Sequence, residues 1–481
     1  MAKINLEEYT SLELGKMIKT KQISVVEAVE ASFERINEIK DEYNCLITTN
    51  EEAALTKAAL IQSHIDSGEE LGNLAGVPIT IKDNICTKNL RTTCGSKMLE
   101  NFIPEYDATV VKNLEAAGCI VVGKNNMDEF AMGSISESSY YGPVKNPINK
   151  EYVVGGSSGG SAAAVKLGTC MMSAGTDTGG SIRLPASYCK VTGLKPTYGT
   201  VSRYGLVAYA SSMDQIGPMA KTVEECAAFL QVMASFDRKD STSVKRKSYD
   251  FASNLGLGVK RLKVGIPVDL LDYVTDEKIK DTVYKAAHIL ENEGAKIVEF
   301  YMGLWDESLE VYSILADSEA SSNLSRFDGV KYGFRAKTYN TLDEMYKNTF
   351  LEGFGEVVRS RIEFGRACLG PENYEKYYLK AAKVRRMIFD NYKKAFEEFD
   401  VLLTPVSPVE VPRLNEKKFN LEGMNIIDIC TVGTNLSGIP GISVPLGTDT
   451  NGMPIGIQLL ANHFQEEMIL RAGKVIEDNR D

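Results

Sequence analysis

Two glycine- and serine-rich segments near the middle of the chain carry the side chains best suited to covalent chemistry. Residues 155–161 read GGSSGGS, and residues 177–183 read DTGGSIR. Paired glycines permit backbone conformations and close approaches that a side chain would prevent. A serine in such a turn can lie beside free backbone N–H groups, which stabilise the oxyanion that forms during acyl transfer. The two segments therefore predict a serine-dependent acyl-transfer site.

Other interpretations of these glycines are open at this point. A phosphate-binding loop would need a Gly-Lys-Ser or Gly-Lys-Thr ending, which neither segment has, and the dinucleotide pattern GxGxxG is absent. A nucleophile elbow, GxSxG, matches at Gly155, Ser157 and Gly159, but it requires a histidine base. The remaining alternative is a flexible glycine loop that only connects two packed elements. Histidine is scarce, which favours a search for a different base; the chain has only His64, His288 and His463.

Lysine can serve as the base if burial keeps its amine neutral. Lys82 directly follows the apolar segment 76–81, which is expected to be a strand, so its amine could be buried at the strand end. The alternative is a lysine that extends into solvent from that end. A second serine-lysine pattern, Ser187-x-x-Lys190, is too short to be specific.

Composition indicates a soluble globular protein rather than a nucleic-acid or membrane protein. The 481 residues are 43% hydrophobic and carry a net charge of −11, with no strong run of lysine and arginine, so a partner is expected to hold any RNA. The first residues lack an apolar leader and no uncharged run could span a bilayer, so we expect a cytoplasmic location. Nine scattered cysteines without a CxxC pair predict neither disulfides nor a metal site. A reactive thiol at Cys86 or Cys94 stays an alternative.

The hydrophobic pattern alternates between helical and extended segments, which is typical of an α/β fold. Capping boxes at Thr10–Glu13 and Ser24–Glu27 begin helices within an N-terminal helical region at about 5–65. A mainly helical excursion is expected at about 303–397. We expect one domain over residues 1–481, with a further helix at 109–117 and another at 276–292, and strands at 76–81, 120–122, 262–266, 296–300, 401–405, 441–445 and 455–460.

Lys82 and the two glycine-serine segments together resemble the amidase signature family. Lys82 lies 75 residues before Ser157, and Ser157 lies 24 residues before Ser181, which also fits that family. The resemblance implies a large mixed central sheet covered by helices on both faces. It implies that Ser181 is the nucleophile, Ser157 a bridging serine held by a cis peptide bond after Gly156, and Lys82 the base. The oxyanion hole is then formed by the backbone N–H groups of Thr178, Gly179, Gly180 and Ser181.

Four further segments are similar to one branch of the family, the A subunits of glutamyl-tRNA(Gln) amidotransferases. This resemblance implies hydrolysis of L-glutamine, with Arg361 binding the α-carboxylate and Asp428 the α-ammonium. Tyr312 and Gly133 match other pocket positions. Asp428 stands out even without the resemblance, because a carboxylate between isoleucines is costly to bury unpaired. The matching segments are 126–133, 201–207, 214–218 and 318–324.

The same resemblance implies a heterotrimer with B and C subunits. Ammonia would pass to a second subunit, where ATP and magnesium convert Glu-tRNA(Gln) to Gln-tRNA(Gln), or Asp-tRNA(Asn) to Asn-tRNA(Asn). No cofactor is expected in this chain, and tRNA is expected to bind mainly through the B subunit. Two alternatives remain: a stand-alone amidase acting on another amide, which would not need Arg361 and Asp428, and a non-catalytic scaffold, against which the intact Lys82, Ser157 and Ser181 argue.

Overall fold

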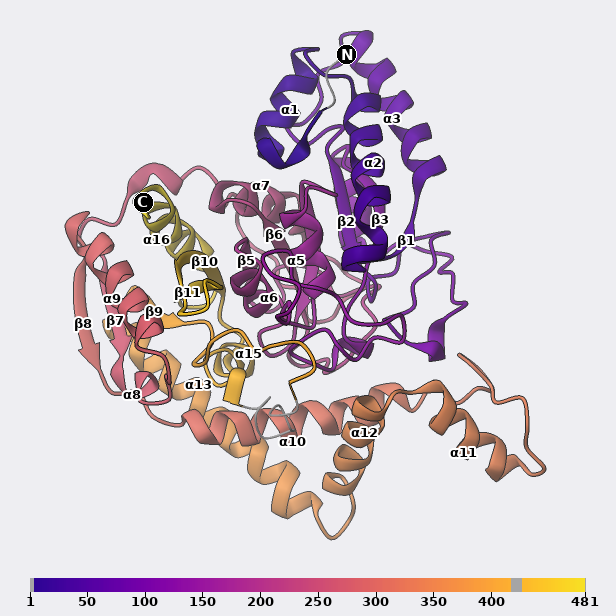
Figure 1. The fold of residues 1–481 in the computed structure, drawn as a ribbon. Helices are drawn as coiled ribbons and strands as arrows, with labels where there is room; N and C mark the ends of the chain where they lie inside the picture. Colours follow the sequence, from indigo (N-terminus) through magenta and orange to yellow (C-terminus); the bar gives the residue numbers. More distant parts are fainter. Residues whose placement is uncertain (1–3, 417–425, 481) are drawn as a thin grey trace.

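A computed structural model describes residues 4–416 and 426–480. Eleven strands form one sheet, which crosses the molecule in Figure 1. In sheet order the strands are β1 (Leu46–Thr49), β3 (Ile120–Asn125), β2 (Pro78–Lys82), β4 (Met172–Asp177), β6 (Gln215–Ala220), β5 (Thr192–Lys195), β10 (Gly441–Thr448), β11 (Pro454–Leu460), β9 (Val401–Pro405), β7 (Lys263–Pro267) and β8 (Lys296–Phe300).

The sheet is mixed, as predicted. Strands β3, β2 and β4 run parallel to one another near one edge, and β8, β7 and β9 do so near the other. The strands between them pair antiparallel. Neighbouring parallel strands have their carboxyl ends on the same side of the sheet, so β2 and β4 end side by side. This arrangement brings Lys82 near Asp177.

Helices cover both faces of this sheet, which confirms the expected architecture. On one face, Ser187 of α6 accepts a hydrogen bond from the Gly456 N–H of β11. On the other, Gly473 of α16 lies against Val444 of β10. The helices are α1 (Ser11–Lys19), α2 (Val25–Tyr43), α3 (Glu51–Asp66), α4 (Thr109–Ala116), α5 (Gly159–Lys166), α6 (Arg183–Tyr188), α7 (Val223–Met233), α8 (Val268–Leu271), α9 (Glu277–Asn292), α10 (Trp305–Leu324), α11 (Leu342–Gly353), α12 (Glu356–Cys368), α13 (Lys380–Glu398), α15 (Val432–Ser437) and α16 (Glu466–Asp478).

The N-terminal helices begin where their capping residues predict. Thr10 and Ser24 are the N-caps of α1 and α2, and in each case the glutamate three residues later completes a capping box. Each side chain thereby satisfies an N–H group that would otherwise lack a partner at the helix start. The predicted apolar face of α2, which includes Val29 and Phe33, is buried.

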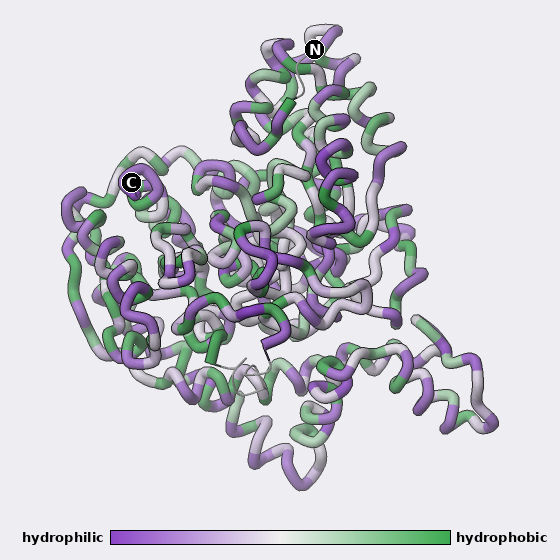
Figure 2. Tube along the Cα trace, viewed as in Figure 1, coloured by the Kyte–Doolittle hydropathy of each residue, from purple (hydrophilic) through white to green (hydrophobic). Residues whose placement is uncertain are grey.

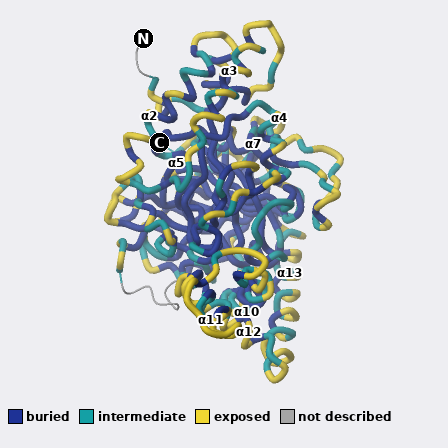
Figure 3. Tube along the Cα trace, turned by 90° about the vertical axis from the view of Figure 1, so that its right-hand side faces the viewer, coloured by how far each residue is buried: buried dark blue, intermediate teal, exposed yellow. Residues whose placement is uncertain are grey.

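The helical excursion predicted at about 303–397 is present as α10 to α13. In Figure 1, α10 runs below the sheet, and α11 and α12 extend from it to one side. Apolar and polar residues alternate closely along these helices in Figure 2, and Figure 3 shows much of α11 and α12 exposed while the sheet is buried. None of the helices in the described ranges combines the length and apolar character needed to cross a membrane.

Candidate active site

The predicted base, bridging serine and nucleophile come together at the carboxyl ends of β2 and β4. Lys82 is the last residue of β2, and Asp177 is the last residue of β4. The segment carrying Ser157 leads into α5, which packs on β2 and β4. Ser181 follows β4 in the short loop before α6. Three segments that are far apart in the sequence therefore meet at one sheet edge.

Within the described residues, Lys82 is held by hydroxyl and carbonyl oxygens and by no carboxylate. Its Nζ lies 2.7 Å from Ser157 Oγ, 2.8 Å from Ser158 Oγ and 3.3 Å from the Thr176 carbonyl oxygen. The side chain is completely buried. Burial lowers the pKa of Lys82 to about 7, although nearby carboxylates, with Asp128 first, oppose the shift. The amine can therefore lose its proton near neutral pH, as a general base must.

The two serines lie on adjoining loops. The Gly156–Ser157 peptide bond is cis, as the resemblance implied. The Ser158 N–H donates to the Ser181 carbonyl oxygen at 3.2 Å, which links the two loops. Ser181 is 8% exposed. Among the hydrogen bonds of the described residues, none joins Ser157 Oγ to Ser181 Oγ. Hydrogen bonds between catalytic groups are often long in unliganded sites and form only when substrate binds.

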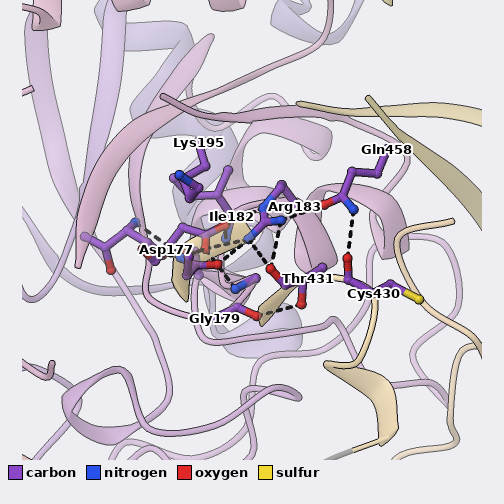
Figure 4. A network of polar contacts seen from close by, with 12 residues as sticks. Asp177, Gly179, Ile182, Arg183, Lys195, Cys430, Thr431 and Gln458 are labelled. Carbon is purple, nitrogen blue, oxygen red and sulfur yellow. Dashed lines mark hydrogen bonds and ion pairs between the residues drawn. The ribbon is translucent and has the colours of Figure 1, made fainter. Parts of the chain in front are cut away.

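Asp177 organises the loop of residues 178–182, called the nucleophile loop here because it carries the predicted nucleophile Ser181. Its Oδ1 accepts the Gly180 N–H at 2.8 Å, and its Oδ2 accepts the Ile182 N–H at 3.1 Å. Arg183 donates to both oxygens at 3.0 Å, as Figure 4 shows. Burial alone would raise the pKa of Asp177, but the Arg183 guanidinium holds it well below its usual range. The ionised Asp177 therefore keeps the loop in one conformation.

The same contacts refine the predicted oxyanion hole. The Gly180 N–H already donates to Asp177, whereas the Thr178, Gly179 and Ser181 N–H groups have no acceptor within residues 4–416 and 426–480. Thr178 is also positioned by its hydroxyl, which donates to Asp214 at 2.7 Å. The Thr178, Gly179 and Ser181 N–H groups are therefore the most available donors for a substrate oxygen.

Arg183 also connects the nucleophile loop to the turn at 428–431. Its guanidinium donates to the Thr431 carbonyl oxygen at 3.3 and 3.2 Å, and to the side chains of Gln458 and Asn435 at 2.6 Å each. Gln458 in turn donates to the Cys430 carbonyl oxygen at 2.9 Å (Figure 4). All these groups are buried, so the network is rigid and shielded from solvent.

Thr431 bridges this turn and the nucleophile loop directly. Its Oγ1 donates to the Gly179 carbonyl oxygen at 2.6 Å, and its N–H donates to the Asp428 carbonyl oxygen at 2.9 Å. A Cβ atom on Gly180 would lie 2.4 Å from Thr431 Oγ1, so the loop needs glycine here. Thr431 therefore positions the loop between the nucleophile and Asp428.

Replacing Thr431 with valine should lower kcat while changing KM little. The substitution keeps the shape of the side chain but leaves the Gly179 carbonyl without its donor, which costs about 1–3 kcal/mol and predicts a loss of roughly tenfold. Thr431→Ser keeps the hydroxyl and is expected to retain most of the activity. Steady-state kinetics of the two variants measure the difference, and equal losses in both would contradict the positioning role.

Asp428 and Gly133, two of the predicted pocket residues, lie near one another. Ser134 Oγ donates to Asp428 Oδ2 at 2.8 Å, and Ser134 directly follows Gly133. A Cβ atom on Gly133 would lie 2.4 Å from Asp128 Cγ, so that position accepts no side chain. Burial raises the pKa of Asp428 to about 7, against the opposing effects of Ser134 and Arg361. A cation bound beside Asp428 would favour its ionised form.

Arg361 reaches the same region from α12. Its Nη1 donates to Tyr209 Oη at 2.6 Å and lies 3.4 Å from Asp317 Oδ1. Its Nε is buried without a hydrogen-bond partner in the described residues. Buried donors usually have partners, so this N–H is available to an acceptor on a ligand. Tyr312 of α10 lies against the nucleophile loop, because a Cβ atom on Gly179 would lie 2.5 Å from its ring.

Comparison with known proteins agrees with this arrangement. The sequence pattern of the family described as Amidase matches residues 27–470. The chain belongs to the amidase family. Two relatives, each named as the A subunit of glutamyl-tRNA(Gln) amidotransferase, come from Agathobacter rectalis and Lachnospira eligens and are 50% and 49% identical to this amidase. The first alignment covers 99% of this chain and 95% of the relative, and the second covers 99% of both.

Solved structures show the same relationship. A crystal structure of the A subunit of glutamyl-tRNA(Gln) amidotransferase from Thermotoga maritima matches with a TM-score of 0.83 and 37% identity, over 100% of this chain and 96% of that one. A peptide amidase bound to chymostatin matches with a TM-score of 0.84 and 27% identity, over 98% of both chains. The fold of this amidase is therefore shared by an amidotransferase subunit and by a peptide amidase.

Neither a histidine nor a cysteine supplies the chemistry of this site. His64 and His288 lie beside surface glutamates, and His463 contacts the Ser437 carbonyl oxygen. The nucleophile-elbow interpretation of Ser157 is wrong, because Ser157 contacts Lys82. Cys86 and Cys94 are buried, and burial raises the pKa of both thiols, so neither is a reactive thiolate.

Several residues around the site have no signal in the sequence. Ser158 contacts Lys82, Ser134 contacts Asp428, and Tyr209 and Asp317 contact Arg361. Ser158 is an ordinary serine next to Ser157 in the sequence. The other three lie in different segments from the residues that they contact. Asp317 is the exception, because a carboxylate that follows Leu315 and Ala316 in a predicted helix could have suggested a buried partner.

Proposed function

We propose that this amidase-family chain hydrolyses L-glutamine as the A subunit of a tRNA-dependent amidotransferase. One observation carries the proposal: Arg361, whose Nε has no hydrogen-bond partner in the described residues, and the half-buried carboxylate of Asp428 both lie beside the serine-lysine site. Hydrogen bonds connect both residues to the loop 178–181, Arg361 through Tyr209 and Asp428 through Thr431. An α-amino acid has the matching carboxylate and ammonium, and a neutral or fatty amide has neither.

The first half of the reaction forms an acyl-enzyme. Neutral Lys82 takes the proton of Ser157 while Ser157 takes the proton of Ser181, and Ser181 Oγ attacks the side-chain amide carbon. Negative charge develops on the amide oxygen, where the free backbone N–H groups of the nucleophile loop stabilise it. The protonated Lys82 then returns its proton through Ser157 to the amide nitrogen, and ammonia leaves. This is the serine-lysine variant of triad catalysis.

The second half releases glutamate. Water adds to the γ-glutamyl ester on Ser181, and Lys82 with Ser157 accepts its proton. The ester bond to Ser181 Oγ breaks, and the serine regains its proton. Lys82 is suited to both halves because burial keeps its pKa near 7, so it can hold and release a proton at neutral pH.

The ammonia would be used in another subunit. We assign the B and C subunits as partners, with ATP and magnesium acting in a partner and tRNA bound mainly by the B subunit. The acidic net charge of −11 supports this division, because a chain that grips tRNA usually has a basic face. Nine buried, unpaired cysteines support a reducing compartment, which favours the cytoplasm.

Replacing Asp428 with asparagine tests the substrate assignment. The change removes the charge that would pair with the α-ammonium, and truncating one partner of a buried charge pair costs about 2–5 kcal/mol, so KM for glutamine should rise roughly 30-fold or more. Glutaramic acid, which is glutamine without its amino group, should be hydrolysed no worse by the variant than by wild type. In the wild type, KM should also rise as the pH falls below about 7, where Asp428 becomes protonated.

Asp281→Asn, an exposed change on α9, is the matched control and should leave KM unchanged. An unchanged KM for glutamine in Asp428→Asn would remove Asp428 from the pocket. Efficient turnover of peptide or aryl amides, with no activity on glutamine, would instead support a stand-alone amidase, the function suggested by the likeness to peptide amidase.

A further inference from the structure

A groove outside the site opens between residues 98–102 and the loop 331–337. Its volume is about 940 Å³, and its floor is made by apolar side chains, including Met98, Leu99, Leu206 and Val207. The loop is fixed to the groove wall, since the Phe334 N–H donates to the Met98 carbonyl oxygen at 2.7 Å. A Cβ atom on Gly333 would lie 2.6 Å from Met98 Sδ, so glycine allows this close contact. The groove is therefore preformed.

The rim of the groove is basic in an acidic protein. Arg326, Lys331, Arg335 and Lys337 line it, and Glu100 is the single carboxylate among its lining residues. The chain as a whole has a net charge of −11, so this local excess of positive charge is a distinct feature.

Part of that charge has no partner. Arg326 and Arg335 each donate to a backbone carbonyl of their own segment. Lys331 and Lys337 are exposed, and neither forms an ion pair with a carboxylate in the ranges 4–416 and 426–480. Two lysine ammonium groups without an ion pair in the described residues, next to apolar lining residues, favour a ligand that carries both acidic and apolar groups.

We propose that this groove docks an acidic polypeptide segment of a partner protein in the assembly, with at least one bulky apolar side chain inserted between Met98 and Val207. The proposal rests on the proposed function, which requires partner subunits. Aromatic side chains also line the groove, among them Phe327 and Phe334. A polypeptide is nevertheless favoured over RNA because the chain as a whole has a net charge of −11, which repels a continuous phosphate backbone and leaves only this local patch of positive charge. Burial of one bulky apolar side chain supplies affinity, and the basic rim adds selectivity for an acidic segment.

The groove also adjoins the glutamine pocket. Val207, Ala208 and Asn323 line it, and Asn323 Nδ2 donates to the Tyr209 carbonyl oxygen at 3.1 Å. Tyr209 Oη in turn accepts the hydrogen bond from Arg361. A segment seated here would press on the residues that position Arg361, so its binding should lower KM for glutamine.

The test uses the full chain produced together with its B and C subunits. A photo-crosslinking amino acid, p-benzoylphenylalanine, replaces Tyr332, which is 60% exposed on the groove rim. Charge reversal by Lys331→Glu with Lys337→Glu is compared with Lys260→Glu and Lys296→Glu, an equal change at exposed lysines outside the groove lining. Crosslinks are mapped by mass spectrometry, and the affinity between the subunits is measured by titration at two salt concentrations.

The expected result is a crosslink to an acidic stretch of the B or C subunit, together with at least tenfold weaker assembly in the groove variant alone. A heterotrimer that forms without such a crosslink, a crosslink to tRNA, or equal effects of the two charge reversals would overturn the docking assignment and leave the proposed function standing. A wild-type chain that assembles with neither partner would overturn the proposed function and the docking assignment together.

Discussion

Replacing Ser181 with alanine is expected to lower kcat for glutamine hydrolysis by about ten-thousandfold or more, because the variant has no hydroxyl to form the acyl-enzyme. The loop should keep its shape, since the contacts that hold it run through Asp177, Arg183 and Thr431 rather than through the Ser181 hydroxyl. Ammonia release under saturating glutamine measures the loss, and thermal unfolding shows whether the fold is retained.

Ser443→Ala is the matched control for this substitution. Ser443 is a buried serine of β10 whose hydroxyl has no hydrogen-bond partner in the described part of the chain. Removing that hydroxyl should leave kcat nearly unchanged. Normal turnover by the Ser181→Ala variant would show that another residue is the nucleophile.

The second large effect is expected at Lys82. Because only the neutral amine can accept a proton, kcat should rise with pH to a plateau, with a midpoint near the pKa of about 7 that burial imposes. Lys82→Met should lower kcat by about a thousandfold or more and abolish this dependence on pH. The pH profile is read from kcat at saturating glutamine, since Asp428 affects KM in the same range.

The same substitution should stabilise the fold at neutral and lower pH. Between about pH 7 and 10.5 the unfolded lysine binds a proton that the folded one has lost, so the free energy of unfolding of the wild type rises with pH across that interval. Below pH 7 the folded protein carries a buried ammonium at full cost. The gain in melting temperature from Lys82→Met should therefore be largest below pH 7 and shrink toward pH 10.

Lys195 offers a control for both readouts. It is also fully buried, and burial lowers its pKa to about 7, but its Nζ donates to the Pro196 carbonyl oxygen and not to a catalytic serine. Lys195→Met should show a similar stability trend and keep the midpoint in the kcat profile. A kcat midpoint that persists in Lys82→Met would show that another group is the base.

The catalytic residues could be predicted because each lies within a segment whose composition is unusual. Glycine pairs mark loops that approach a ligand or another backbone, and Gly179 and Gly180 do so against Tyr312 and Thr431. Lys82 could be placed at a strand end by the apolar run before it. The roles of these residues came from the family resemblance, because nothing in local sequence says that segments 75 and 24 residues apart meet in space.

The supporting residues could not be predicted, because their importance arises only from tertiary contacts. Thr431 is an unremarkable threonine until the fold places its hydroxyl 2.6 Å from the Gly179 carbonyl oxygen. Tyr209 and Asp317 lie 108 residues apart and meet only around Arg361. Arg361 itself would be interpreted as a surface charge on an amphipathic helix.

The fold was predictable to a similar extent. Strands such as β8 and β9, which are short runs of apolar or β-branched residues, appear where expected. Strands β1, β4, β5 and β6 were not expected. Strands β4, β5 and β6 contain glycine, and β6 also contains proline, which lowers their strand propensity; they are strands because neighbours on both sides pair with them in the buried sheet. Sheet order likewise depends on contacts between distant segments.

The acyl-enzyme can be detected from the mass of the intact protein after rapid acid quenching with L-glutamine, followed by peptide mapping. Catalysis by Ser181 predicts a γ-glutamyl ester on this residue, absent from the Ser181→Ala variant and diverted to γ-glutamyl hydroxamate when hydroxylamine is added. Glutamate release with no adduct on Ser181 and no hydroxamate, or an adduct on a different residue, would contradict it.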